Sequence, residues 1–342
     1  MTTRHRPATR LIHAGERPPA AAPLTVPIYE TSTFTFDSAA EVEDYAAGRS
    51  AKFLYSRYDN PTVVAVEQKL AEVDGAEASL VFASGMAAIS TALFGLLSAG
   101  DEVVCCSAIY GGTFHILNSL CARFGVTTRW ATIEEFRTPA ALIGPKTRVV
   151  WFESPINPTL RVVEIAPVVA ACRAAGVLSV MDNTFASPVN QPVLAMGVDL
   201  SMQSVTKYLN GHSDVTGGVL SGRREIVDRL IRPRRLLGGI MDPQPAYALG
   251  RGMKTLGLRV AQHNANAMAI ADALDGHPAL ASVSYPGLAS HPDHAVAKAQ
   301  MTGFGGMLTV DLKGGQAAAY RAFDRFGIVQ RATSLGGVES LA

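Results

Sequence analysis

Polar side chains follow apolar, strand-like segments at several places in this 342-residue chain, and one of them is a lysine. The segment Val198–Gln203 leads into Ser204, Thr206 and Lys207, so an amine and two hydroxyl groups are expected together at one strand end. A lysine amine can form an imine with a carbonyl compound, and the hydroxyls suit a neighbouring phosphate group. A single lysine is more often a solvated surface charge, but three polar side chains after an apolar strand favour a binding site.

A second strand end offers backbone groups instead of side chains. The segment Ser79–Ala83 is followed directly by Ser84-Gly85-Met86 and then by a predicted helix. Such a junction presents free N–H groups and the positive end of a helix, which together favour a phosphate group. A Ser-Gly pair is also common as a helix N-cap and turn, so this pattern alone leaves both interpretations open.

A third strand end carries an acidic residue, because Asp182 follows the apolar run Val177–Met181. Burying a carboxylate there is unfavourable unless it meets a cation. The protonated pyridine nitrogen of pyridoxal 5'-phosphate (PLP) is a cation of this kind. A helix cap or turn cap is the alternative interpretation, and on this evidence both stay open.

A mostly parallel sheet would bring these strand ends together. From Asn60 onward, short apolar segments alternate with helical ones, which is typical of a parallel sheet covered by helices on both faces. In such a sheet, ligands bind beyond the carboxyl ends of the strands. Strands are predicted at residues 79–83, 102–106, 126–130, 148–152, 177–181, 198–203 and 217–221, with helices after Pro61 and at 86–98, 112–124 and 165–175.

The pattern divides the chain into three parts. Residues 1–55 are rich in proline and are predicted to form an N-terminal arm with one short helix capped by Ser38. Residues 56–250 are predicted to form the cofactor-binding α/β domain. Residues 251–342 are predicted to form a smaller, apparently incomplete α+β C-terminal domain, with a helix at 256–274, strands at 281–285 and 307–312, and a helix at 316–326.

Composition excludes several classes of protein. The charged fraction is 17% and the net charge is +1, so neither a nucleic-acid partner nor an acidic membrane surface is indicated. No apolar stretch reaches membrane-spanning length, and the N-terminus lacks the pattern of a secretory signal. No metal site is expected, because the four cysteines lack ligand spacing. We therefore expect a reduced, cytoplasmic protein whose cysteines are Cys105, Cys106, Cys121 and Cys172.

A series of short motifs follows along the chain: Thr9–His13, Val26–Tyr29, Tyr55–Thr62, Ser84–Ala88, Tyr110–Thr113, Glu153–Thr159, Asp182–Thr184, Ser204–Tyr208, Arg251–Leu256 and Ser334–Ser340. Together they resemble the cystathionine γ-synthase, cystathionine γ-lyase and methionine γ-lyase family of PLP enzymes over essentially the whole chain. Each motif alone is moderate evidence, whereas the ordered set is specific. The resemblance implies the PLP-dependent transferase type I fold and PLP as the cofactor.

The resemblance also implies roles for single residues. Lys207 matches the lysine that forms the Schiff base with PLP, and Asp182 matches the partner of the pyridine nitrogen. Tyr110 is similar to the tyrosine that stacks on the cofactor ring and assists proton transfer. The remaining matches are Gly85, Met86, Ser204 and Thr206 as phosphate ligands, Tyr55 and Arg57 as phosphate ligands from a neighbouring subunit of a homotetramer, Asn157 near the ring oxygen and the substrate, and Ser334 at the substrate carboxylate.

The activity that the resemblance implies is that of a carbon–sulfur lyase. Such an enzyme would act on a sulfur amino acid by elimination, as cystathionine γ-lyase and methionine γ-lyase do in trans-sulfuration and methionine breakdown. A γ-replacement transferase, such as cystathionine γ-synthase or an O-acylhomoserine sulfhydrylase, is the alternative. A third possibility is a PLP-binding but inactive protein, and an aminotransferase fits the motifs less well.

Several positions depart from the family pattern. Cystathionine-handling members usually carry an arginine at the position of His115 and a glutamate at that of Thr333. Losing both charges argues against a long substrate with a charged distal end. Methionine-cleaving members typically carry a cysteine at the position of Gly112, so the chain matches neither subgroup, and we interpret His115 as a helix-surface residue.

The family continues for several dozen residues after the Ser334–Ser340 motif. That segment includes the arginine which pairs with the substrate α-carboxylate. We therefore expect this chain, which stops at Ala342, to be a truncated form, because every earlier motif is intact. If it were complete, turnover should be impaired, since substrate positioning accounts for much of the rate.

Overall fold

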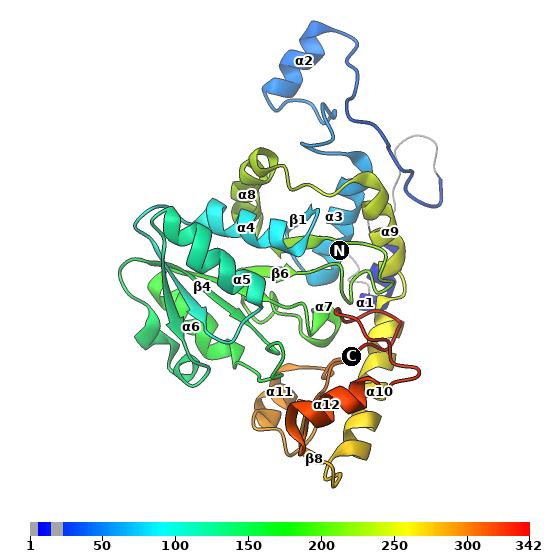
Figure 1. Ribbon diagram of the computed structural model, residues 1–342. Coiled ribbons are helices and arrows are strands. Elements are labelled where there is room, and N and C mark those ends of the chain that lie inside the picture. The colour runs from blue at the N-terminus through cyan, green and yellow to red at the C-terminus, as the bar shows by residue number, and fades with distance from the viewer. Residues whose placement is uncertain (1–5, 15–22) are drawn as a thin grey trace.

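The computed structural model describes residues 6–14 and 23–342, so the predicted arm at residues 1–55 lies partly outside the described residues. The chain forms a larger part built on a seven-stranded sheet and a smaller part built on a two-stranded sheet. Figure 1 shows the smaller part below the larger one, with a segment from the N-terminal region projecting at the top. The predicted fold class, an α/β sheet flanked by helices with a smaller α+β domain, is confirmed.

The large sheet is mixed but mostly parallel. Its order is β1-β7-β6-β5-β4-β2-β3, in which β7 runs antiparallel to both of its neighbours and the pairs from β3 to β6 are parallel. The chain returns from β6 to β7 through a turn-rich segment without a crossover helix, as an antiparallel pair permits. The strands are β1 (Ala78–Phe82), β2 (Glu102–Cys106), β3 (Thr127–Ala131), β4 (Thr147–Glu153), β5 (Leu178–Asp182), β6 (Leu200–Gln203) and β7 (Gly218–Gly222).

The helices agree with the sequence pattern where they are long and apolar on one face. The predicted helix at 112–124 is instead a short α-helix followed by a π-helical turn at Leu117–Cys121. The helices that were not predicted are α1, α7, α8, α9 and α11. The α-helices are α1 (Pro7–His13), α2 (Ala39–Ala46), α3 (Pro61–Asp74), α4 (Gly85–Leu96), α5 (Gly111–Ile116), α6 (Ile165–Ala175), α7 (Ser187–Asn190), α8 (Arg224–Leu237), α9 (Pro243–Met253), α10 (Leu256–Leu274), α11 (His294–Gln300) and α12 (Gly315–Phe323).

The predicted helix starts in the arm and before α4 have the expected caps. The Ser38 hydroxyl accepts the Glu41 N–H at 3.3 Å, and the Glu41 carboxylate accepts the Asp37 N–H at 2.8 Å. This is a capping-box arrangement displaced by one residue, and it begins α2. The Ser84 hydroxyl accepts the Ala87 N–H at 3.0 Å and begins α4 at the end of β1. Local side-chain chemistry therefore determines where both helices begin.

The two faces of the sheet bury separate cores because side chains alternate along each strand. Val103 and Cys105 of β2 pack with α4 and α8 on one face, whereas Val104 and Cys106 pack with α6 on the other. Both cysteines are fully buried, and burial raises the pKa of the Cys106 thiol to about 11. These thiols are structural members of the core, as the apolar run around them predicted.

The smaller part is attached to the larger one by α10. In Figure 1 this helix runs from the side of the large sheet down into the smaller part. There, strands β8 (Leu280–Ser284) and β9 (Thr309–Leu312) pair in the antiparallel sense that the sequence predicted. The Arg259 guanidinium of α10 is buried and donates to the carbonyls of Tyr208 at 2.7 Å and Gly252 at 3.0 Å. This contact joins α10 to the turn that follows β6.

Candidate active site

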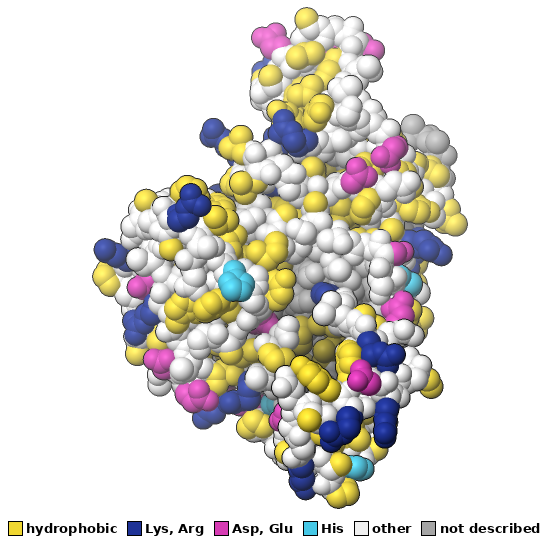
Figure 2. Space-filling view, viewed as in Figure 1, with side chains coloured by type: hydrophobic (Ala, Val, Ile, Leu, Met, Phe, Trp, Pro, Cys, Tyr) yellow, Lys and Arg dark blue, Asp and Glu magenta, His cyan; other side chains and the backbone are white. Residues whose placement is uncertain are grey.

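A cavity of about 560 Å³ lies at the carboxyl ends of the parallel strands. The visible face of the molecule is hollowed between the larger and the smaller part (Figure 2). The structure brings nine of the predicted site residues together around the cavity, because parallel strands end at the same edge of a sheet. These residues are Gly85, Met86, Tyr110, Asn157, Asp182, Ser204, Thr206, Lys207 and Ser334.

Lys207 lies in the turn after β6, and its amine reaches the cavity. The amine donates to the Ser334 hydroxyl at 2.9 Å, and partial burial lowers the pKa of the lysine. Ser334 has a φ of 146°, a backbone conformation that residues other than glycine rarely adopt. The segment is held there by Gly336, where an added Cβ would lie 2.6 Å from the Tyr208 nitrogen. The amine is therefore directed by one hydroxyl and is more easily neutral than a surface lysine.

Asp182 ends β5 and is 6% exposed. Its Oδ1 accepts two hydrogen bonds from Thr184, from the hydroxyl at 2.6 Å and from the backbone N–H at 3.0 Å. Burial raises the pKa of this carboxyl, and among the described residues no cation pairs with it. A buried carboxylate without a cation, close to a half-buried lysine, fits the protonated ring nitrogen of PLP.

The end of the cavity that suits a phosphate is formed where α4 meets the turn after β6. The N–H groups of Gly85 and Met86 are at the first two positions of α4, where an α-helix leaves its donors unpaired. Gly85 lies beside Ser204, since a Cβ added at Gly85 would be at van der Waals distance, 3.4 Å, from both Cβ and Oγ of Ser204. The Thr206 hydroxyl is used differently, because it donates to the Gly217 carbonyl at 3.2 Å and accepts the Gly217 N–H at 2.9 Å.

Tyr110 caps α5, and its ring is 45% exposed at the cavity. An added Cβ at Gly112 would overlap the Tyr110 ring and the Met86 sulfur. A cysteine at position 112 therefore does not fit beside this ring position unless the tyrosine moves.

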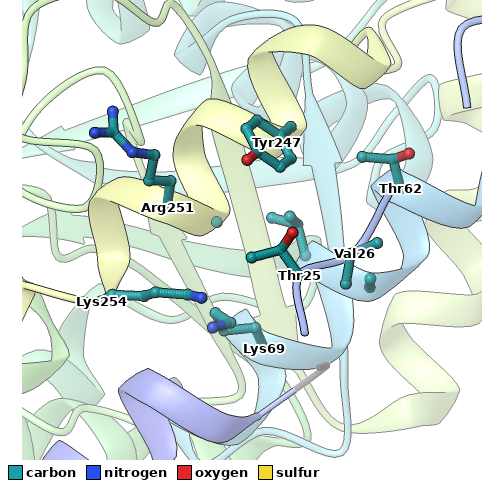
Figure 3. Close-up of a pocket in the computed structure, with 10 residues that line it drawn as sticks. Thr25, Val26, Thr62, Lys69, Tyr247, Arg251 and Lys254 are labelled. Carbon is teal, nitrogen blue, oxygen red and sulfur yellow. The ribbon is translucent and has the colours of Figure 1, made fainter. Parts of the chain in front are cut away.

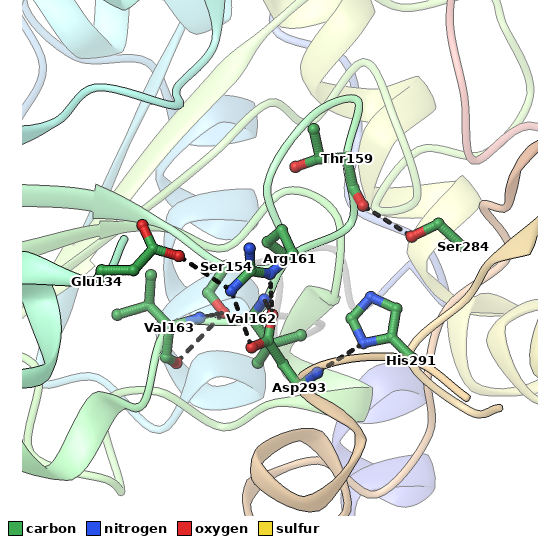
Figure 4. A network of polar contacts seen from close by, with 9 residues as sticks. All are labelled: Glu134, Ser154, Thr159, Arg161, Val162, Val163, Ser284, His291 and Asp293. Atoms are coloured by element: carbon green, nitrogen blue, oxygen red, sulfur yellow. Dashed lines mark hydrogen bonds and ion pairs between the residues drawn. The ribbon is translucent and has the colours of Figure 1, made fainter. Parts of the chain in front are cut away.

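Asn157 lies in the loop after β4. Figure 4 shows Thr159 and Arg161 of this loop in contact with Ser284 and Asp293 of the smaller part. The Arg161 guanidinium forms two hydrogen bonds with Asp293, at 2.6 and 3.2 Å, and Asp293 also accepts the Val162 N–H at 2.9 Å. These donors hold the pKa of Asp293 below its usual range. The Ser284 hydroxyl donates to the Thr159 carbonyl at 2.8 Å. The loop that carries Asn157 is thus attached to both parts of the molecule.

Tyr55 and Arg57 do not reach this cavity. Both lie between α2 and α3, and the Arg57 guanidinium donates to the Arg235 carbonyl at 2.7 Å while lying 4.8 Å from the centre of the Tyr58 ring. The predicted set therefore divides into nine residues at the cavity and two outside it, on a segment that is largely exposed.

Sequence reasoning missed three polar residues that the structure places at the cavity, Glu153, Thr184 and Thr216. Glu153 carries the same signal that identified Asp182, because it follows an apolar run, Arg148–Phe152, at the end of a predicted strand. Thr184 links two predicted residues, since its hydroxyl donates to Asp182 and accepts the Ser204 N–H at 2.8 Å. No pattern in the sequence distinguishes that threonine from a turn residue.

A second pocket, of about 270 Å³, contains none of the predicted site residues. Lys69 and Lys254 extend into it from α3 and from the end of α9 (Figure 3). The Lys69 amine donates to the carbonyls of Leu11 at 3.1 Å and Ile12 at 3.3 Å, near the end of α1. This pocket is a junction between the N-terminal segment and two helices of the larger part. In residues 6–14 and 23–342, no cluster of acidic, histidine or cysteine side chains could hold a metal ion, and no helix could cross a membrane.

Comparisons with known proteins cover nearly the whole chain. A family model described as Cys/Met metabolism PLP-dependent enzyme matches residues 8–342. The chain is 41% identical over 338 residues to L-methionine gamma-lyase of Pseudomonas putida, and 42% identical over 339 residues to cystathionine gamma-synthase of Mycobacterium tuberculosis; each match covers 98% of this chain and 85% of the relative. The crystal structure of cystathionine gamma-lyase from Lactobacillus plantarum complexed with L-serine matches with a TM-score of 0.92 and 37% identity, covering 98% of this chain and 86% of that chain.

Proposed function

Because this chain belongs to the Cys/Met metabolism family of PLP-dependent enzymes, we propose that it is a carbon–sulfur lyase that cleaves a sulfur amino acid by elimination. The family, the cofactor and the enzyme class agree with the predictions made from the motifs. The relatives include both lyases and synthases, and the comparisons therefore do not distinguish the two reactions. The lyase reaction is our proposal. The observation that carries it is a half-buried lysine and two buried carboxyl groups, Asp182 and Glu153, in a cavity whose remaining wall is uncharged.

Three cavity residues, Lys207, Asp182 and Tyr110, have proposed tasks in this reaction. When bound, PLP supplies an electron sink for the bond that breaks at the substrate α-carbon. We assign Lys207 to accept the α-proton, because its pKa is lowered and its amine is oriented by Ser334. Asp182 balances the positive charge at the ring nitrogen, and the Tyr110 hydroxyl donates a proton to the departing sulfur. Loss of a γ-substituent needs a second proton transfer, from the β-carbon. Lys207 can serve as the base for this step as well, once it has passed the α-proton on to the bound cofactor.

The cavity wall supports an uncharged side chain on the substrate. Among the described residues that line the cavity, the charged ones are Glu153, Asp182 and Lys207, and all three lie at strand ends. The remaining lining includes Thr333, whereas His115 is exposed on α5 and does not line the cavity. A substrate with a charged distal end would lack a partner, so we propose a thioether amino acid such as methionine over cystathionine. The apolar lining residues are Ile89, Phe185, Met202, Met307 and Leu335, besides Met86.

Assays without and with an added nucleophile test this proposal. We expect the purified protein with PLP to release a keto acid and a thiol from methionine alone, and less from cystathionine at equal concentration. The measurements are keto-acid and thiol yields with methionine, cystathionine, cysteine and O-acetylhomoserine. Product formation only when a thiol is added to O-acetylhomoserine would instead establish the γ-replacement alternative, which the synthase relatives keep open. Absence of turnover with PLP bound would establish the inactive alternative.

We further propose that Tyr55 and Arg57 complete the active site of a second copy within a homotetramer. A phosphate group carries up to two negative charges, and Lys207 is the one cation among the described residues that line the cavity. Arg57 lies on the segment that leads to the projecting α2 in Figure 1, where it is accessible to another subunit. An arginine suits this task because its planar guanidinium binds phosphate through two donors.

Complementation between two inactive variants tests that proposal. Lys207→Ala and Arg57→Ala damage different residues of a shared site, so refolded mixtures should contain some sites with neither defect. We expect mixtures to show turnover that neither variant has alone, measured after confirming mixed oligomers by mass. Mixed oligomers that remain inactive would contradict a shared site.

The location and the domain division also remain proposals. We propose a cytoplasmic enzyme, supported by four cysteines that are buried as free thiols. We likewise keep the division into an arm at 1–55, a PLP-binding domain at 56–250 and a C-terminal domain at 251–342 as the proposed organisation.

A further inference from the structure

A single buried carboxylate joins two loops at the edge of the cavity. Glu153 is the last residue of β4 and is 3% exposed. Its Oε2 accepts the Tyr110 N–H at 2.9 Å, and its Oε1 accepts the Asn157 N–H at 2.8 Å. Tyr110 precedes α5, whereas Asn157 belongs to the loop after β4. Each oxygen therefore holds one loop, and both loops carry a side chain that lines the cavity.

The side chains of Tyr110 and Asn157 depend on their backbones for orientation. Neither side chain forms a hydrogen bond with another described residue, and both are exposed at the cavity. The Tyr110 N–H has Glu153 as its acceptor. Beyond Asn157, the Thr309 hydroxyl donates to the Pro158 carbonyl at 2.6 Å, so the smaller part holds that loop from outside. Glu153 supplies the contact from the side of the sheet.

The chemistry of this position requires a carboxylate. Two converging N–H donors need two acceptors, and an ionised carboxylate offers two acceptors without presenting a donor. A glutamine would direct its NH₂ group at one of the two N–H groups. An ionised acid is also electrostatically unfavourable at this position, because Glu153 is paired in register with Asp182 of β5, and burial together with Asp182 raises the pKa of Glu153. The N–H groups of Asn157 and Tyr110 act in the opposite direction and favour the ionised form. A side chain that only filled space would avoid this second buried acid.

We propose that Glu153 is a positioning residue of the active site, whose carboxylate fixes the backbones of Tyr110 and Asn157 and so sets the geometry of their side chains around the cofactor. This inference rests on the proposed binding of PLP at Lys207. Glu153 acts through the two loops and not on the substrate, so its loss should disturb cofactor orientation and proton transfer more than substrate binding.

The variant Glu153→Gln tests the inference, with Asp199→Asn as the matched control. The Asp199 carboxylate also accepts a backbone N–H from a neighbouring strand, that of Ser179 at 2.9 Å, but it lies at the opposite end of the sheet. For Glu153→Gln we expect a reduced visible circular dichroism signal per bound PLP and a kcat lower by about 10- to 100-fold, with KM changed much less. The Asp199→Asn protein should match the wild type in both measurements. An unchanged dichroism signal and kcat in Glu153→Gln would overturn the inference.

A double-mutant cycle separates positioning from a general loss of structure. If Glu153 acts through Tyr110, the kcat loss caused by Glu153→Gln should shrink when Tyr110→Phe has already removed the hydroxyl. Losses that multiply fully in the double variant would show that Glu153 does not act through that hydroxyl. Borohydride reduction and mass analysis of the wild type come first, because failure to label Lys207 contradicts the proposed cofactor site itself. A labelled Lys207 with a normal Glu153→Gln protein contradicts only the role of Glu153.

Discussion

Replacing Lys207 with alanine is expected to abolish covalent attachment of PLP and to lower turnover by at least about 1,000-fold. The variant loses both the amine that binds the cofactor and the base that moves the substrate protons, and a positioned base alone contributes about 10²–10⁴-fold. Ser334 would keep its hydroxyl but lose the amine that it contacts at 2.9 Å. The measurements are borohydride trapping followed by peptide mass analysis, and kcat with the substrate that the assays identify.

Lys146→Ala is the control for this experiment. Lys146 is exposed, and its backbone carbonyl, not its amine, accepts the hydrogen bond from the Glu102 N–H. This variant should keep both the trapped adduct and the turnover. If Lys207→Ala still yields a borohydride-stable adduct, another amine holds the cofactor and our central assignment is wrong.

Replacing Asp182 with asparagine is expected to lower kcat/KM by about 160- to 5,000-fold. Asparagine has nearly the same shape and can still accept both hydrogen bonds from Thr184, so the loss comes from the charge. Leaving a buried cation without its partner costs about 3–5 kcal/mol, and this free energy converts to the stated factor. PLP affinity should fall in the same variant, which fluorescence titration would measure.

The same variant should have the opposite effect on the protein without PLP. Burial raises the pKa of Asp182 above its unfolded value of 3.8. A raised pKa means that stability from this group is present below pH 3.8 and is lost as the pH rises through the folded value. Asparagine cannot ionise, so at neutral pH the cofactor-free Asp182→Asn protein should unfold at a higher temperature than the wild type.

Thermal unfolding of the two cofactor-free proteins across pH checks this sign. The difference should be small near pH 3.8 and should grow towards neutral pH, while Asp199→Asn should show no comparable gain. A cofactor-free Asp182→Asn protein that is less stable at neutral pH would mean that Asp182 already has a stabilising partner. A lower kcat/KM together with a higher unfolding temperature of the cofactor-free protein would show that the charge of Asp182 serves activity at the expense of stability.

The sequence by itself predicted the features that depend on local patterns. The short apolar runs predicted the strands of the large sheet, since a strand buried on both faces has few polar positions. Ser38 and Ser84 predicted two helix starts because a hydroxyl can accept an N–H of the first helical turn. Asp182 was identified because an acidic residue directly after a buried strand is unusual, and Lys207 because it follows an apolar strand together with two hydroxyl residues.

Other features were not predictable from local patterns. The Glu153 carboxylate can contact Tyr110 only because β2 and β4 are neighbours in the sheet. This strand order brings the Tyr110 N–H within 2.9 Å of the carboxylate, although the two residues are 43 positions apart in the sequence. Only the tertiary structure shows that a side chain at position 112 would meet the Tyr110 ring and the Met86 sulfur. Contacts across the sheet depend on strand order and register, and the hydrophobic pattern of single strands does not specify strand order.

Lys207 thus illustrates both sources of information. Its sequence context, an apolar strand followed by hydroxyl residues, favoured a binding site, and the resemblance of the motifs to a PLP family implied the role of cofactor lysine. Only the tertiary structure decided which groups surround its amine: Ser334, from a segment 127 positions away, reaches it across the cavity. The tertiary structure also decided that Tyr55 and Arg57 lie outside the cavity. The side-chain chemistry of a residue determines which reactions and contacts it can take part in. The chain topology determines which residues it contacts, because residues distant in the sequence come together only when helices and strands pack.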